Sequence, residues 1–200
     1  LGTRTFLLGL LIAVFSIAQF FSAPILGVFS DRYGRKPILL ISILGTSIGY
    51  ALFALGIVLA NLPLLFLSRA IDGLTGGNIS VVRSAIADIS PGDELKVKNF
   101  GLVGMVFGFA FIFGPFIGGE LTNTSLISWF SSATPFWFAA VLAAVNMALV
   151  WIVFKETLKT KMHRVISFLS GLRDIRNAFS MQSLRVIFIT LFLIMFGFSF

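Results

Sequence analysis

An arginine and an aspartate, Arg69 and Asp72, lie three residues apart in the apolar segment 63–88. This segment is long enough to cross a membrane as a helix, where charges are costly and almost always face a cavity or a partner. The pair could be a structural ion pair that holds the helix in its bundle, or a titratable pair in a transport cavity. In the second case, Asp72 would be a carboxylate whose ionisation depends on which side water reaches. Four further residues are expected on the same helical face: Gly73, Gly76, Ser80 and Arg83.

A second group of charges lies in the short segment 27–37, between two apolar blocks. Gly34 permits a tight turn there, and Pro37 suits the first turn of a following helix. The three cations of the segment would anchor the turn at anionic headgroups. That explanation leaves the carboxylate of Asp31 without a role.

The segment 98–119 is rich in glycine and contains one proline. Small residues four apart let helices approach closely in lipid, and proline removes an amide donor and bends a helix. The pattern fits static close packing, and it also fits a hinge, since a packed kink can pivot. The residues concerned are Gly104, Gly108, Gly114, Pro115, Gly118 and Gly119.

The elements that position these residues are long apolar segments rather than amphipathic ones. The chain is 58% hydrophobic and 12% charged, with a mean hydropathy of +1.02, whereas a soluble domain keeps roughly 25% of its residues charged. Runs of this length predict membrane-spanning helices, so the expected fold class is an all-α polytopic membrane protein. The predicted spans are 5–29, 37–60, 63–88, 98–119, 134–154 and 184–200.

The net charge of +7 is concentrated between the predicted spans, which argues against nucleic-acid binding. The basic loops 30–36, 89–97 and 155–183 fall on one face if the spans alternate, and the positive-inside rule makes that face cytoplasmic. Residues 164–179 combine apolar residues at helical spacing with basic ones. They predict an amphipathic helix at the membrane surface, with a partner-binding segment as the alternative.

The charged turn resembles the signature between helices 2 and 3 of the major facilitator superfamily. Its pattern, G-x-x-x-D-R-x-G-R-[RK], is met at every defined position from Gly27 to Lys36. In that family this turn latches two six-helix halves together on the cytoplasmic side. The resemblance implies that Arg35 pairs with Asp31 and with an acid at the end of helix 4, here Asp88. The latch would comprise Gly27, Asp31, Arg32, Gly34, Arg35 and Asp88.

Two other segments are similar to motifs of the same family. The stretch from Leu65 to Gly77 resembles the helix-4 motif, whose fixed arginine corresponds to Arg69 and is linked to proton transfer in proton-coupled members. Asp72 departs from the motif, because an uncharged residue is usual there. The run 108–119 resembles the helix-5 antiporter motif of the drug/proton branch, which favours export over uptake.

The resemblance implies a major facilitator fold, of which this chain would supply helices 2 to 7 of an expected twelve. Residues 1–154 would form the N-terminal six-helix half without its first helix, 155–183 a cytoplasmic linker, and 184–200 the start of helix 7. Substrate would bind near mid-membrane between the two halves. The candidates for substrate contact are Gln19, Phe107, Phe111 and Asn146.

The sequence therefore predicts a monomeric secondary transporter that exports amphiphilic or cationic small molecules in exchange for protons. The alternatives are a symporter or facilitator for a nutrient such as a sugar, and a non-transporting sensor or scaffold, which would not need latch and hinge motifs. We expect no enzyme activity, cofactor or metal site. The glycine-rich run 73–77 lacks the Lys-Ser/Thr of a phosphate-binding loop, and His163 has no metal partners around it.

Overall fold

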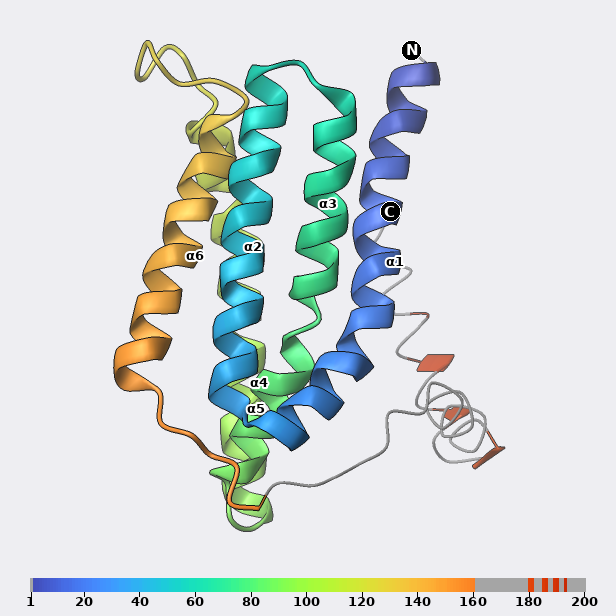
Figure 1. The fold of residues 1–200 in the computed structure, drawn as a ribbon, viewed down its shortest axis with the longest axis vertical. Coiled ribbons are helices and arrows are strands. Elements are labelled where there is room, and N and C mark those ends of the chain that lie inside the picture. Colours follow the sequence, from blue (N-terminus) through green and yellow to red (C-terminus); the bar gives the residue numbers. More distant parts are fainter. Residues whose placement is uncertain (1, 161–179, 182–184, 187–188, 191–192, 194–200) are drawn as a thin grey trace. The chain divides into compact units, whose positions relative to one another are not determined.

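The computed structural model describes residues 2–160 continuously and, beyond them, 180–181, 185–186, 189–190 and 193. It divides the chain into two units, 1–164 and 165–200. The predicted amphipathic helix at 164–179 and most of the predicted span 184–200 lie outside the described residues. The described part of the first unit contains six helices (Figure 1): α1 (Gly2–Tyr33), α2 (Arg35–Val58), α3 (Leu62–Gly76), α4 (Ile79–Asp88), α5 (Asp93–Glu120) and α6 (Thr134–Val153).

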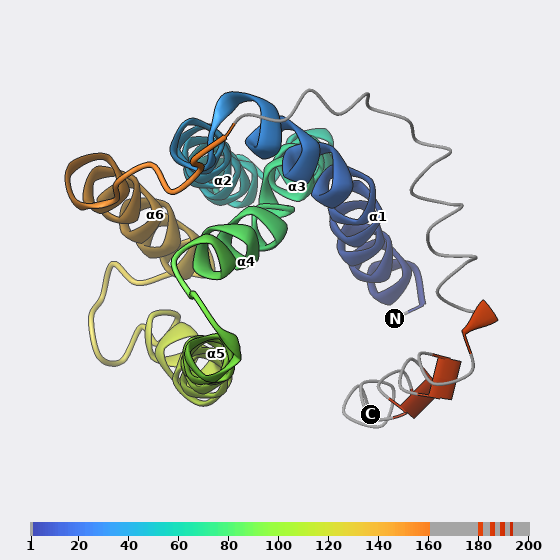
Figure 2. The same ribbon diagram turned by 90° about the horizontal axis from the view of Figure 1, so that it is seen from below.

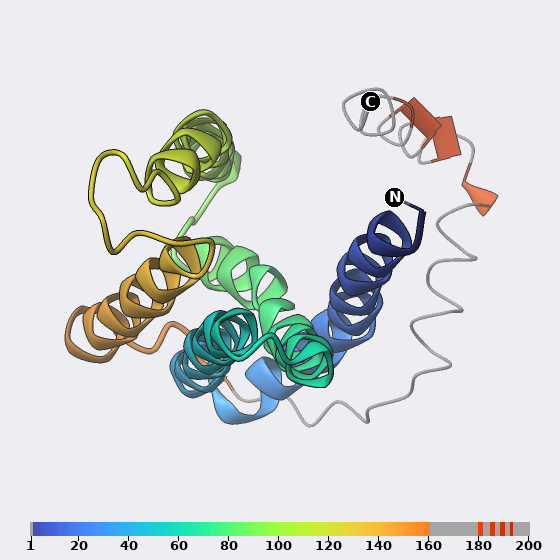
Figure 3. The same ribbon diagram turned by 90° about the horizontal axis from the view of Figure 1, so that it is seen from above.

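Helix α2 is at the centre of the packing in the first unit. It lies against α3 on one side and α6 on the other, while α1 packs against α3 (Figure 1). Views along the helices show α5 standing beside this row, and α4 is the one described helix with which it makes substantial contact (Figures 2 and 3). Side chains from α2, α4 and α6 meet in an apolar core around Ile38, Leu39, Ile43 and Val81.

Helices α1, α2, α5 and α6 each contain a stretch long and apolar enough to cross a membrane. Their most apolar windows have mean hydropathies of 2.1 to 2.2, and at most a third of any such window is buried inside the chain. Apolar side chains can remain this exposed because lipid, rather than water, surrounds them. The prediction of an all-α, multi-pass membrane protein is confirmed.

The predicted span 63–88 is interrupted, because α3 ends at Gly76 and α4 begins at Ile79. Side chains of α1 bond the carbonyl groups near the break: Gln19 Nε2 donates to Gly76 O at 2.9 Å, and Ser22 Oγ donates to Gly73 O at 3.0 Å. The expectation of one continuous polar face from Arg69 to Arg83 is therefore wrong. Ser80 and Arg83 lie on the separate helix α4 instead.

The charged turn between the first two helices is shorter than the predicted loop 30–36, since Gly34 alone separates α1 from α2. Gly34 has a φ of 116°, in the region that side chains other than glycine rarely adopt. Asp31 consequently lies in the last turn of α1 and Arg35 in the first turn of α2. At the loop 89–97, helix α5 likewise begins earlier than predicted, at Asp93.

Candidate functional site

The predicted pair on α3 is present. Arg69 Nη1 lies 3.3 Å from Asp72 Oδ2, and the side chains are 16% and 4% exposed. A carboxylate this buried needs a compensating charge or hydrogen bonds, which Arg69 supplies at this distance. The pair lies within α3, between the apolar helices α1 and α2, so it meets the geometric requirement of both interpretations of its role.

Aromatic rings from three helices surround the guanidinium of Arg69. Its Cζ lies 4.0 Å from the ring centroid of Phe53, and 5.9, 6.0 and 5.8 Å from those of Phe15, Tyr50 and Phe136. Ring faces attract a cation, and the attraction grows where water is excluded. The sequence did not reveal this cage, because among 24 phenylalanines nothing distinguishes the three that take part.

The carboxylate of Asp72 is placed by a close approach between α2 and α3. A Cβ added at Gly49 would lie 2.8 Å from Asp72 Cβ and 3.2 Å from its Cα. Gly45 and Gly56 continue this row along α2, against Thr75 and Leu65 of α3. These glycines were missed by the sequence analysis, although Gly45 and Gly49 have the four-residue spacing of small-residue packing.

We expect Gly49→Ala to destabilise the protein by about 1–3 kcal/mol, as overpacking does, and to displace Asp72. The added methyl group meets the backbone of Asp72, which cannot move aside as a flexible side chain would. Thermal unfolding of the purified protein measures the cost. Gly104→Ala on α5 is the matched control, because a Cβ there meets nothing within 4 Å. Equal losses in the two variants would contradict the assigned contact.

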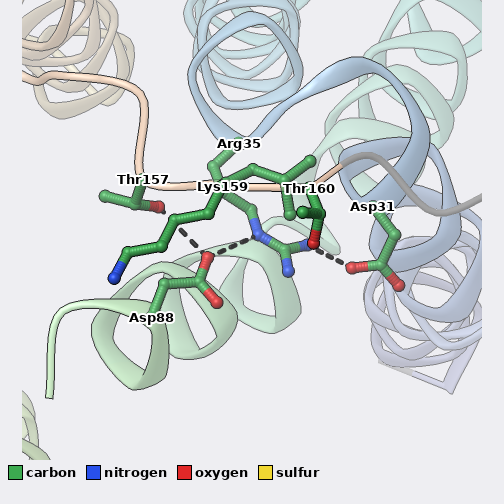
Figure 4. A pocket seen from close by; sticks show the side chains of 7 residues that line it. Asp31, Arg35, Asp88, Thr157, Lys159 and Thr160 are labelled. Atoms are coloured by element: carbon green, nitrogen blue, oxygen red, sulfur yellow. Dashed lines mark hydrogen bonds and ion pairs between the residues drawn. The ribbon is translucent and has the colours of Figure 1, made fainter. Parts of the chain in front are cut away.

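A second cluster surrounds Arg35 where α1 ends and α2 begins. Arg35 Nη1 lies 2.5 Å from Asp31 Oδ1 and 2.6 Å from Ser30 Oγ, and its Nε lies 3.0 Å from Asp88 Oδ2 (Figure 4). The guanidinium of Arg35 on α2 thus bonds side chains of α1 and α4, and Arg35 is 6% exposed. The predicted pairing of Arg35 with Asp31 and Asp88 is confirmed.

The other predicted latch residues lie beside this cluster. Gly27 faces α4, with Ser80 Oγ 3.8 Å from the position of an added Cβ. Arg32 is exposed, and its guanidinium lies 5.3 Å from the ring centroid of the adjacent Tyr33. Arg32 therefore stands at the surface rather than in the buried network.

The chain that follows α6 crosses this cluster, which the sequence analysis did not anticipate. Thr157 Oγ1 donates to Asp88 Oδ2 at 3.2 Å, and Figure 4 shows both beside Arg35. A cavity of about 270 Å³ lies among these groups. The residues that line it are Asp31, Arg35, Asp88, Thr157, Leu158, Lys159 and Thr160.

The remaining predicted site residues are not brought together by the described part of the chain. The glycines of α5 have open space around them, with nothing within 4 Å of an added Cβ at Gly104, Gly108, Gly114, Gly118 or Gly119, and Pro115 lies inside the helix. The candidate contact residues Gln19, Phe107, Phe111 and Asn146 are spread over α1, α5 and α6, and Gln19 bonds the α3 backbone. Among residues 2–160, no group of His, Cys, Asp or Glu could hold a metal ion.

Comparison with known proteins shows what this chain is similar to. The model of the Major Facilitator Superfamily matches residues 1–200. The chain is 40% identical over 151 residues to the tetracycline resistance protein, class H, of Pasteurella multocida, covering 76% of this chain and 35% of that protein. It is 38% identical over 136 residues to the quinolone resistance protein NorA of Staphylococcus aureus, covering 68% of this chain and 32% of that protein.

A solved structure also shares the fold. The crystal structure of the human organic anion transporter MFSD10 (TETRAN) matches with a TM-score of 0.68 and 27% sequence identity. The match covers 82% of this chain and 36% of that one. The chain therefore spans about a third of the length of the relatives it matches.

Proposed function

Because this chain belongs to the Major Facilitator Superfamily, we propose that it is part of a proton-coupled antiporter that exports amphiphilic or cationic small molecules. The protein would act as a monomer by alternating access. The observation that carries the proposal is the buried carboxylate of Asp72, 3.3 Å from Arg69 inside a membrane helix bundle. Ionisable groups in such positions mark proton and substrate pathways.

The coupling step would be the gain and loss of one proton at Asp72. When the carboxylate is ionised, it neutralises Arg69 across the 3.3 Å pair. When it is protonated, Arg69 loses its counter-charge, and the aromatic cage around Arg69, in which the Phe53 ring is nearest, remains as its partner. A cationic substrate favours the ionised carboxylate for the same electrostatic reason that Arg69 does, so substrate and proton would compete.

Helix α2 offers a mechanical link between this pair and the cluster at Arg35. Its first residue is Arg35, and Gly49 of the same helix lies against Asp72. At about 1.5 Å per residue, these positions are roughly 21 Å apart along one helix. A shift of α2 would change both the ion pairs of Arg35 and the packing around Asp72. We propose that the Arg35 cluster is the latch that closes the cytoplasmic side.

The relatives support export without identifying the substrate. Two are named for resistance to tetracycline and to quinolones, and the structural neighbour is named an organic anion transporter. One of these names specifies an anion, so the charge of the substrate has to be varied in the assay. For the proposed exchange, a cationic substrate is favoured because it would compete with the proton at Asp72.

The test uses the full-length protein containing this chain, reconstituted in proteoliposomes with an imposed pH gradient and a fluorescent proton reporter. A cationic drug, tetracycline, an organic anion and a sugar are added in turn. We expect proton release on addition of the cationic drug. Proton uptake driven by the sugar alone would instead establish a symporter. The absence of any flux would overturn the transport proposal in favour of a sensor or scaffold.

A further inference from the structure

The start of α2 is held by a carboxylate that is distant in sequence, that of Glu156 after the end of α6. The first backbone N–H groups of a helix have no partner within it, and an anion there is also favoured by the helix dipole. Gly34, which precedes α2, has no side chain to serve as a cap. Instead, Arg35 N donates to Glu156 Oε1 at 2.9 Å and Lys36 N donates to Glu156 Oε2 at 3.1 Å.

Glu156 is itself fixed by the backbone that follows it. The N–H groups of Thr157 and Leu158 both donate to Oε1 at 3.0 Å. Partial burial by itself raises the pKa of Glu156, but the four N–H groups of Leu158, Arg35, Lys36 and Thr157 outweigh burial and hold the pKa below its ordinary value. The carboxylate is therefore ionised at neutral pH.

Gly34 leaves the space that this carboxylate fills. A Cβ added at Gly34 would overlap Glu156 Oε2 and lie 3.1 Å from Glu156 Cδ. The turn thus excludes a side chain for two independent reasons, the positive φ and the carboxylate. The first reason acts within the turn, and the second depends on a residue more than 100 positions away.

The same short segment also holds the other side of the Arg35 cluster. Thr157, next to Glu156, donates to the Asp88 oxygen that Arg35 Nε also contacts. Glu156 therefore binds the backbone of Arg35, and the adjacent Thr157 binds Asp88, the acid that accepts from the Arg35 side chain. In addition, Lys36 Nζ donates to Trp151 O at 2.7 Å, which ties the start of α2 to the last turns of α6.

We propose that Glu156 is a positioning residue for the Arg35 ion pairs, that it acts as the N-terminal cap of α2, and that Gly34 admits its carboxylate. The role in transport rests on the proposed function above, whereas the cap itself does not. When the segment after α6 moves, α2 loses its cap and Asp88 loses a hydrogen bond together. The start of α2, the end of α4 and the segment after α6 would then separate together, rather than two ion pairs breaking one at a time.

Hydrogen exchange in the purified full-length protein tests the cap without any transport assay. We expect Glu156→Ala to speed exchange of the Arg35 and Lys36 amides by roughly fivefold, the effect of losing one cap. Glu156→Gln should speed this exchange less, because the side-chain carbonyl of glutamine can still accept a hydrogen bond from a backbone N–H group. Glu120→Ala, which removes an exposed carboxylate at the end of α5, is the matched control. Unchanged exchange in a folded Glu156→Ala protein would overturn the cap.

A double-mutant cycle tests the reason for Gly34. The melting temperatures of Gly34→Ala, Glu156→Ala and the double variant are compared with that of the parent protein. Gly34→Ala strains the positive φ equally whether or not Glu156 is present, so that strain cancels in the cycle. The remaining coupling energy measures the clash between the added methyl group and the Glu156 carboxylate. We expect Gly34→Ala to lower the melting temperature less when Glu156 is absent. Additive shifts would refute the statement that Gly34 admits the carboxylate.

A kinetic measurement separates positioning from mere stabilisation. We expect Glu156→Ala to lower the maximal transport rate and leave the substrate concentration at half-maximal rate unchanged, with partial recovery in Glu156→Gln. Unchanged maximal rates together with altered exchange would refute the positioning role. If the parent protein shows no transport, the proposed function fails, and the exchange and melting data still decide the cap.

Discussion

Replacement of Asp72 by asparagine is expected to lower drug-driven proton release by about 100-fold or more. A coupling site that cannot exchange a proton leaves only background release, which sets the size of this expected loss. The same change also destabilises the folded protein, by about 3–5 kcal/mol for breaking a buried pair. Asparagine has nearly the same shape but cannot ionise, and it leaves Arg69 without a counter-charge at a site where its side chain is 16% exposed. The proteoliposome assay with the pH reporter measures the loss directly.

Asp93→Asn is the matched control for that change. Asp93 lies in the first turn of α5 with a fully exposed side chain, and its contact with Lys96 is 3.7 Å long. Loss of this carboxylate should leave proton release unchanged. If Asp72→Asn retains the full response, antiport stands and the coupling carboxylate is another residue.

A double substitution distinguishes a structural ion pair from a coupling pair. In Arg69→Gln with Asp72→Asn, two neutral side chains can hydrogen-bond across the same distance, so much of the stability lost in Asp72→Asn should return. We expect thermal unfolding to recover while proton release stays absent. Recovery of proton release as well would show that the pair serves only to hold α3 in the bundle.

The second large effect is expected at Arg35, where lysine should not replace arginine. Arg35 contacts Asp31 through Nη1 and Asp88 through Nε, and one ammonium group cannot reproduce this fixed fork. We expect Arg35→Lys to destabilise the protein by about 2–3 kcal/mol. This is less than for a fully buried pair, because both carboxylates keep about a quarter of their surface.

Arg32→Lys makes the same chemical change three residues earlier in the turn. Arg32 is exposed and lies over the ring of Tyr33, so its replacement should change stability by less than about 0.5 kcal/mol. Thermal unfolding of the two variants gives the comparison. Equal effects at both arginines would contradict the distinction between a buried latch residue and a surface cation.

Local and compositional features of the sequence were sufficient for much of this structure. The predicted span 134–154 agrees with helix α6, Thr134–Val153, because an apolar run of that length has to satisfy its backbone within a helix in lipid. Arg69 and Asp72 are three residues apart on α3 and meet through helical geometry alone. Arg35 and Asp31 are four residues apart but lie in different helices, so their contact also needs the turn at Gly34. The pairing of Arg35 with Asp88, 53 positions apart, followed from the family resemblance rather than from spacing.

Contacts between distant segments were decided by the tertiary structure. The spacing of Gly45 and Gly49 equals that of Gly104 and Gly108, yet only the first pair lies against another described helix. At the break after Gly76, the carbonyl of Gly76 accepts from Gln19 of α1, a contact that joins residues 57 positions apart.

Glu156 is the clearest case of a contact that the tertiary structure decided. An acid just after a span reads as an ordinary surface residue, and no local pattern indicates that it bonds the start of another helix. Its backbone partners on α2, Arg35 and Lys36, are 121 and 120 positions away. Sequence pattern determines which segments enter the membrane and which charges share a helical turn, because both depend on neighbours along the chain. Which carboxylate reaches which helix end depends on how the helices pack, and the folded chain alone decides that.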